Sequence, residues 1–331
     1  AMSRKPDQGA YQPMQRFLDA FPPVSGNTVN GLGETEVRRP SPFFWHPPDR
    51  QTHGRLQAEV TEYHRQSAAM REHFDSNPPG GRGPAPLPKS AVRIDKPAAQ
   101  WRDELKAFTL ANEGDDIRIT AMRSLYVYEG YTLADPWVIL IAVGMSYEEL
   151  SQAPASFENP SAGVVVAKEY NRASRVSRRL ANHILAQGHH AKAWPGPYAS
   201  ALSMMPAAID AGMGQLGKHG SLIHRTLVSA FRLAAVTTDL PLMADSAEDF
   251  GAQDFCLNCQ ICTRACPPGA ISNDKQMVRG VEKWYVDFDK CIPYFGETLA
   301  CGICLAVCPW SRPGTAPSLA EKMLRRRERI G

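Results

Sequence analysis

Eight cysteines near the end of the chain constrain its fold more than any other feature. The chain has 331 residues, and all of its cysteines lie between residues 256 and 308. Disulfides are disfavoured where cysteines stand two residues apart in a reducing compartment, and one zinc ion would use only four of the thiols. The cysteines form two blocks that both end in Cys-x3-Cys-Pro: Cys256, Cys259, Cys262 and Cys266, then Cys291, Cys301, Cys304 and Cys308.

The spacing in the first block is that of bacterial ferredoxin-type iron-sulfur ligation. In such a run three cysteines bind one cluster, and the fourth, turned away by the proline, binds its neighbour. Two 4Fe-4S clusters need eight thiolates, and the chain has eight with none left over. We therefore predict two clusters, one held by Cys256, Cys259, Cys262 and Cys308, and the other by Cys266, Cys291, Cys301 and Cys304.

Composition excludes several other classes of protein. With 43% hydrophobic and 21% charged residues, the chain is of the core-forming kind. Its longest apolar run, residues 137–145, is under half of the roughly 20 residues needed to cross a bilayer, so we predict no membrane span. The net charge is only +3, and it is spread along the chain except for a basic run at 325–329. A charge this small and even predicts no nucleic-acid partner. Neither a charged apolar leader nor a twin-arginine leader opens the sequence, so we expect a cytoplasmic protein.

Proline and glycine divide the chain into three parts. Residues 77–88 are mostly proline and glycine, which predicts a loop, and residues 56–74 can form one helix before it. We therefore assign residues 1–100 to a proline-rich arm and linker. Residues 101–250 form the predicted core, and residues 251–331 form a ferredoxin-like domain with two clusters and a basic tail.

Hydrophobic periodicity in the core predicts alternating helices and strands. This alternation indicates an α+β fold with a layered arrangement of helices and sheet. The expected elements are helices over 101–111, ended by Gly114, and 171–187, ended by Gly188, with strands over 117–121, 137–144 and 231–238.

A glycine-rich segment, residues 211–220, follows the second helix. Dense glycine permits the close approach of a large planar or phosphorylated ligand, but it is equally typical of a chain with many turns. The sequence alone leaves both interpretations open.

The order of the motifs resembles the cobalamin-dependent reductive dehalogenases. The motifs are Ala201-Leu202-Ser203, the glycine-rich segment, Thr238 to Leu242, Asp249-Phe250-Gly251 and the two cysteine blocks. The resemblance implies a nitroreductase-like core that holds cobalamin beside the nearer cluster. The cobalamin would be base-off, since the chain has no Asp-x-His-x-x-Gly motif. The cofactor contacts that the resemblance implies are Ser203, Gly212, Gly214, Gly217, Lys218, His219 and Gly220.

The resemblance also implies a tyrosine and a basic residue at the active site. Tyr170, expected at the start of the second helix, matches the tyrosine, and Arg232 is the best match for the cation, with Arg225 as its rival. A tyrosine can deliver the proton that replaces a halide, particularly if a guanidinium stabilises the resulting anion. Without the resemblance, Tyr170 would read as a packed tyrosine and Arg232 as a solvated charge on a strand.

Three functions are compatible with these features. The first is reductive dehalogenation of an organohalide, expected to be a halogenated aromatic such as a phenol. Its electrons would come from a separate ferredoxin, flavodoxin or reductase. The second is an epoxyqueuosine reductase, whose Gly-Lys turn resembles Gly217-Lys218 but whose Asp-Tyr-His is Glu169-Tyr170-Asn171 here. The third is an iron-sulfur electron carrier.

Overall fold

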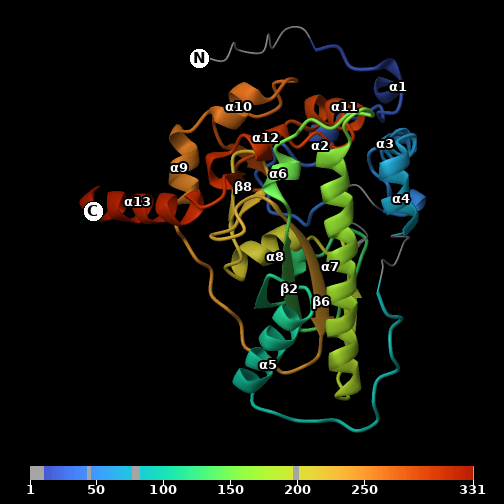
Figure 1. Ribbon diagram of the computed structural model, residues 1–331, viewed down its shortest axis with the longest axis vertical. Helices are drawn as coiled ribbons and strands as arrows, with labels where there is room; N and C mark the ends of the chain where they lie inside the picture. The colour runs from blue at the N-terminus through green and yellow to red at the C-terminus, as the bar shows by residue number, and fades with distance from the viewer. Residues whose placement is uncertain (1–10, 43–45, 77–82, 197–200, 331) are drawn as a thin grey trace.

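A four-stranded antiparallel sheet forms the centre of the core (Figure 1). The computed structural model describes residues 11–42, 46–76, 83–196 and 201–330. The three predicted strands are present, and a short fourth strand, which the sequence analysis missed, pairs with the last of them. In spatial order the strands are β1 (Asp116–Ala121), β2 (Trp137–Gly144), β6 (Phe231–Thr238) and β3 (Ala191–Trp194).

Strand β2 has apolar layers on both of its faces, as its continuous run of apolar residues predicts. Ile139 and Ile141 pack under α5 (Ala98–Ala111) and α7 (Ser161–Ala186). On the opposite face, Leu140 packs against α8 (Met204–Asp210). Antiparallel pairing with helices on both faces confirms the predicted α+β class.

Helix α7 begins much earlier than predicted. It starts at Ser161 rather than Asn171, so the expectation that Tyr170 opens the helix is wrong, and Tyr170 lies well inside it. The run Val164-Val165-Val166 hides this start, because β-branched residues have low helix propensity. The predicted end is confirmed, since Gly188 adopts the left-handed conformation with φ of 80°. At the end of α5 the residue in that conformation is Glu113, not the predicted Gly114.

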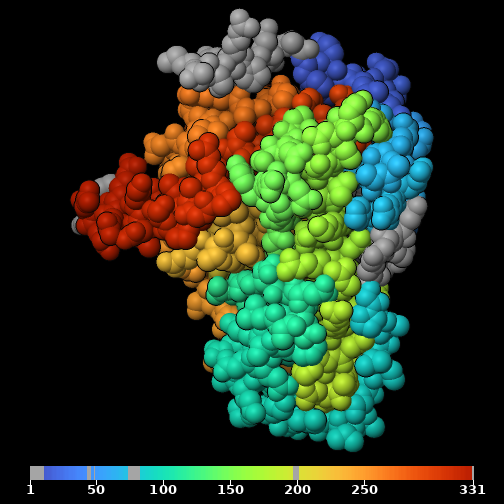
Figure 2. Space-filling view, viewed as in Figure 1, coloured from blue at the N-terminus to red at the C-terminus, as the bar shows by residue number. Residues whose placement is uncertain are grey.

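The helix predicted over 56–74 is two helices. They are α3 (Leu56–Arg65) and α4 (Ala68–Ser76), and the break lets each pack on a different partner. Helix α3 packs against α11 (Phe288–Glu297), whereas α4 packs against α7, as Figure 2 shows for the light-blue and green segments. Two short helices precede them, α1 (Gln15–Leu18) and α2 (Gly26–Val29).

The proline-rich linker is partly described. Residues 77–82 lie outside the described residues, and residues 83–88 have no helix or strand, as predicted. The Leu87 amide donates to the Asn182 Oδ1 of α7 at 2.9 Å, so the linker runs along this helix.

Short helices and turns dominate after residue 250. Helix α13 projects from the body and carries the basic run (Figure 1). Within the described ranges, no helix combines the length and the apolar character needed to span a membrane. The three-part division of the chain stays a prediction. The elements here are α9 (Ala252–Asn258), α10 (Ile261–Ala265), β7 (Gln276–Val278), β8 (Val281–Lys283), α11, α12 (Ile303–Ala306), η3 (Pro309–Ser311) and α13 (Thr315–Ile330).

The remaining elements connect the core. They are η1 (Pro48–Arg50), η2 (Ser124–Tyr126), α6 (Tyr147–Leu150), β4 (Gln215–Leu216) and β5 (Leu222–Ile223). Strands β4 and β5 pair with each other and enclose the second half of the glycine-rich segment.

Candidate functional site

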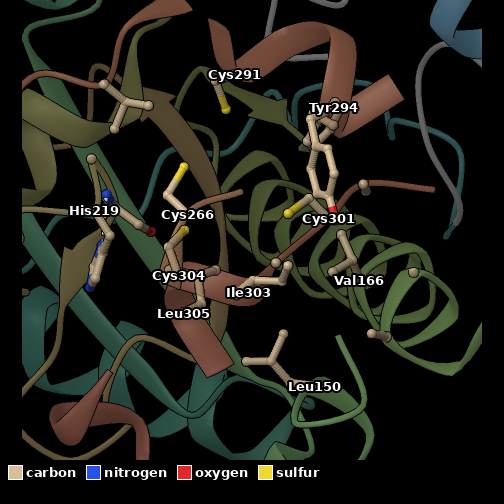
Figure 3. Close-up of a pocket in the computed structure, with 18 of the residues that line it drawn as sticks. Leu150, Val166, His219, Cys266, Cys291, Tyr294, Cys301, Ile303, Cys304 and Leu305 are labelled. Carbon is tan, nitrogen blue, oxygen red and sulfur yellow. Dashed lines mark hydrogen bonds between the residues drawn. The ribbon is translucent and has the colours of Figure 1, made fainter. Parts of the chain in front are cut away.

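One cavity of about 280 Å³ lies where the arm, the core and the cysteine-rich region meet (Figure 3). Tyr170 and Arg232 line it from the core. The cysteine-rich region contributes Cys266, Cys291, Cys301 and Cys304. The fold thus brings the two predicted catalytic residues and one predicted cysteine set to a single cavity.

The other four cysteines line a separate small pocket. This pocket also contains Lys218, His219 and Trp310, and its thiols are those of Cys256, Cys259, Cys262 and Cys308. All eight thiols are free of disulfides. The structure therefore groups the cysteines into the same two sets as the ferredoxin pattern.

The chemistry of these thiols fits a buried metal cluster. Burial, together with the neighbouring thiols, raises the pKa of Cys262, Cys291 and Cys308 to about 12. Metal ligation needs the thiolate, so bound iron must supply the positive charge that offsets this cost. The Ala270 amide donates to the Cys266 sulfur at 3.3 Å, a polar contact that favours its anion.

Tyr170 lies on one stripe of α7 and Arg232 lies at the start of β6. The guanidinium carbon of Arg232 is 5.5 Å from the centre of the Tyr170 ring. The Arg232 Nε also donates to the Met145 sulfur at 3.3 Å, which fixes the guanidinium beside the ring. Arg225, by contrast, is exposed and pairs with Glu248. The cation beside Tyr170 is therefore Arg232 and not its rival.

Protein packing accounts for the glycines of the 211–220 segment. Gly212 and Gly220 both have φ of 76°, a backbone conformation that side chains rarely permit. A Cβ at Gly214 would lie 2.6 Å from the Ile223 carbonyl oxygen, and one at Gly217 would lie 2.6 Å from the His219 ring. Turns and close packing thus explain all four glycines, and their contact with a cofactor stays a prediction.

His219 lies between the two groups of cysteines and lines both of their cavities. Burial lowers the pKa of its ring to about 4, so the ring is neutral at pH 7. Its Nδ1 accepts from the Ser221 amide at 3.2 Å. The ring hydrogen is therefore assigned to Nε2, which lies 3.2 Å from the Ser229 hydroxyl.

A second cavity, of about 590 Å³, is lined by more basic than acidic side chains and was missed from the sequence; its two carboxylates are Asp210, which pairs with Arg123, and Glu282. Burial and the nearby Arg279 lower the pKa of Lys283 to about 8. Trp284 lines this cavity and Val286 lines the first, so the chain between them separates the two. The sequence did contain one signal of it, because Lys275, Arg279 and Lys283 stand four residues apart along the β7–β8 hairpin. The cavity is lined by Ser203 together with Arg38, Arg123, Lys275, Arg279 and Lys283.

The sequence analysis also missed the apolar wall of the first cavity. His64 and Met70 reach it from the arm, which was not expected to contribute to the site. The α7 residues on this wall follow a helical stripe that ends at Tyr170, and this periodicity was the signal to read. The wall includes Leu150, Ala162, Gly163, Val166, Ala167, Ile303 and Leu305.

Curated relatives of this chain include reductive dehalogenases and epoxyqueuosine reductases. A tetrachloroethene reductive dehalogenase of Desulfitobacterium hafniense is 30% identical over 191 residues, which are 54% of this chain and 33% of that protein. The enzyme of the same description from Sulfurospirillum multivorans is 31% identical over 185 residues, or 53% of this chain and 35% of that protein. An epoxyqueuosine reductase of Cyclobacterium marinum is 34% identical over 122 residues, or 32% of this chain and 36% of that protein. The chain spans about a third of the length of these relatives.

Solved structures and a domain family identify the fold. A B12-dependent reductive dehalogenase structure matches with a TM-score of 0.69 and 23% identity, over 83% of this chain and 42% of that one. A catabolic reductive dehalogenase matches with the same TM-score and 22% identity, over 94% of this chain and 47% of that one. The 4Fe-4S dicluster domain family matches residues 255–311. The chain therefore has the reductive dehalogenase fold with a C-terminal 4Fe-4S dicluster domain, and it is a homologue of the reductive dehalogenases.

Proposed function

We propose that this chain is a cobalamin-dependent reductive dehalogenase, an oxidoreductase that replaces a halogen of a small organohalide with hydrogen. The observation that carries the proposal is the first cavity, where Tyr170 and Arg232 face the same space as four cysteines. A proton donor, a cation and a source of electrons are the three components that the reaction needs. Similarity to the tetrachloroethene reductive dehalogenases supports the same assignment.

The residues present fit a corrinoid cofactor. The basic second cavity suits a phosphate-bearing nucleotide tail, because cationic side chains converge there from distant parts of the chain. Ser203 lines this cavity, and Lys218 lies against its wall through Trp284. When bound, cobalamin supplies a strongly reducing cobalt centre. The base-off form is part of this proposal, as are the predicted contacts at Ser203, Gly212, Gly214, Gly217, Lys218, His219 and Gly220.

Tyr170 and Arg232 divide the proton chemistry between them. Reduction of the substrate breaks the carbon-halogen bond and uses two electrons and one proton. The Tyr170 hydroxyl gives that proton to the carbon and recovers one from solvent. The Arg232 guanidinium, 5.5 Å from the ring, stabilises the phenolate in the interval.

The substrate in this proposal is a halogenated aromatic compound. The first cavity offers apolar side chains such as Leu150, Val166 and Leu305, which suit a ring and a carbon-bound halogen. Electrons would come from a separate carrier protein and pass from one cysteine set to the other. They would enter at the first cysteine set, Cys256, Cys259, Cys262 and Cys308, and leave at the second, Cys266, Cys291, Cys301 and Cys304, which lines the first cavity. We place the enzyme in the cytoplasm as part of the same proposal.

The Tyr170→Phe variant tests the function. Phenylalanine keeps the ring and removes the acidic hydrogen, so dehalogenation of halogenated phenols should fall roughly 10²- to 10⁴-fold. The assay uses protein loaded with clusters and cobalamin, and reduced viologen as the electron donor. Cluster and cobalamin content should stay at the wild-type level.

The Tyr147→Phe variant is the matched control. Tyr147 donates to the Ala306 carbonyl at 3.0 Å outside the cavity, so its loss should cost about 0.5–1.5 kcal/mol of stability and little turnover. A Tyr170→Phe enzyme within about threefold of wild type would show that the proton comes from another group. Loaded wild-type protein that reduces epoxyqueuosine in a tRNA stem-loop but no organohalide would favour the second candidate function.

A further inference from the structure

Lys218 is a buried amine that the proposed proton chemistry does not use. Its side chain is 2% exposed, and its Nζ has no hydrogen-bond partner among the described residues. A buried ammonium without a partner is strongly disfavoured, so such a residue needs a compensating negative group. The question is which group, bound when the protein is complete, supplies that charge.

The surroundings of Lys218 point to the first cysteine set. The side chain lines the small pocket formed by Cys256, Cys259, Cys262 and Cys308. The backbone amide of Lys218 also donates to the Cys256 sulfur.

Trp284 holds the amine from the other side. The Lys218 Nζ lies 4.8 Å from the centre of the Trp284 ring, within range of a cation–π contact. This contact orients the ammonium but adds no net negative charge. A cluster with four thiolates does carry one, and it becomes more negative when it accepts an electron.

We propose that the Lys218 ammonium is the counter-charge of the cluster held by the first cysteine set and raises the reduction potential of that cluster. A fixed cation in a low-dielectric site stabilises the reduced state more than the oxidised state. The cluster that does not share the Tyr170 cavity would then accept an electron from the donor more readily. The inference rests on the two-cluster part of the proposed function and not on dehalogenation.

The test is a redox titration of cluster-loaded protein followed by electron paramagnetic resonance. Lys218→Met removes the charge and leaves the backbone amide in place. It should make reduction of one cluster at least about tenfold less favourable, which corresponds to about 59 mV for a one-electron couple, and leave the other cluster unchanged. Lys218→Gln should give the same shift in potential. In Lys218→Arg the equilibrium constant for reduction of that cluster should stay within about threefold of the wild-type value.

Lys275→Met is the matched control. The Lys275 ammonium lies over the same Trp284 ring at 5.6 Å, but Lys275 is partly exposed, so solvent screens its charge. Its loss should shift the potential by less than half as much. An equal shift for both lysines would show that the general surface charge, and not the buried amine, sets the potential.

Other outcomes would overturn the inference. Reduction potentials that stay unchanged in Lys218→Met protein loaded with both clusters would overturn it. If that variant also binds less cobalamin than wild type, Lys218 is a cofactor contact, as the sequence predicted. Lys218→Met and Lys218→Gln could lose the cluster of the first cysteine set altogether. If Lys218→Arg then retains that cluster, the positive charge is what the cluster needs; if Lys218→Arg loses it too, the inference is wrong. Wild-type protein without two clusters would instead refute that part of the proposed function.

Discussion

At the scale of single residues, Arg225 and Arg232 show how the fold chooses between candidates that the sequence cannot separate. They stand only seven residues apart in the sequence. Because β6 begins at Phe231 and pairs with β2, Arg232 is held in the sheet beside Tyr170. Arg225 precedes the strand and meets Glu248 at the surface instead. The pairing of β6 with β2 places Arg232 at the site, and it joins segments that are distant in the sequence.

This difference predicts unequal effects of two similar variants. Arg232→Met should lower dehalogenation about tenfold or more, since the phenolate of Tyr170 loses its neighbouring cation. Arg225→Met should stay within about twofold, because an exposed ion pair contributes little. Steady-state rates with reduced viologen check both, with cobalamin content as the control. The reverse order of the two losses would make Arg225 the active-site cation.

At the scale of elements, the sequence predicts what local periodicity encodes. The strands β2 and β6 were predicted with their observed bounds, because each is a continuous β-forming run. The four-residue β3 is too short for a periodic signal. The break between α3 and α4 depends on their packing against α11 and α7, which no local pattern contains.

Buried histidines make the arm sensitive to acid. Burial lowers the pKa of His46, His53 and His64 to about 4. The three imidazole rings bind protons near pH 6.5 in the unfolded arm but stay neutral down to about pH 4 in the folded arm. The stability that the neutral rings contribute is therefore complete above pH 6.5 and is lost progressively towards pH 4. At pH 5.5 each histidine should lower the free energy of unfolding of the arm by about 1 kcal/mol relative to neutral pH.

Amide hydrogen exchange at pH 7.5 and 5.5, corrected for intrinsic rates, measures this effect. The free energy of opening α3 should fall at pH 5.5 relative to that of β2 in the same sample. His64→Gln should reduce the difference, because the His64 Nε2 lies 2.9 Å from the Gly296 carbonyl oxygen and joins α3 to α11. Equal changes in α3 and β2 would mean that these histidines do not control the attachment of the arm.

At the scale of the whole molecule, the two kinds of cofactor site differ in how far a sequence predicts them. The cysteine sets follow from spacing within some 50 residues, and the structure groups them in the same way. The basic cavity gathers Arg38, Arg123, Ser203 and Lys283, which are distant in the chain. Only the folded chain brings such residues together, so the sequence signals this cavity only through the regular spacing of Lys275, Arg279 and Lys283.

Cofactor content tests the molecule as a whole. After anaerobic reconstitution we expect about eight iron and eight acid-labile sulfide per chain, as two 4Fe-4S clusters require. With cobalamin added, the visible spectrum under reducing conditions should be that of base-off Co(II). Four iron per chain, stoichiometric zinc, or a cobalt that carries a nitrogen ligand from the protein would each contradict the assignment.

The attachment of the arm has a consequence for biosynthesis. The Asn27 side chain donates to Asp287, 260 residues further along, and accepts from the Phe288 amide at the start of α11. The ribosome makes the arm some 260 residues before α11, so the arm leaves the exit tunnel long before its docking partner exists. Until α11 has been made, the side of the first cavity that His64 and Met70 later cover stays open. Because Cys291 lies in α11 itself, the arm can close this side of the cavity only once that metal ligand has been made.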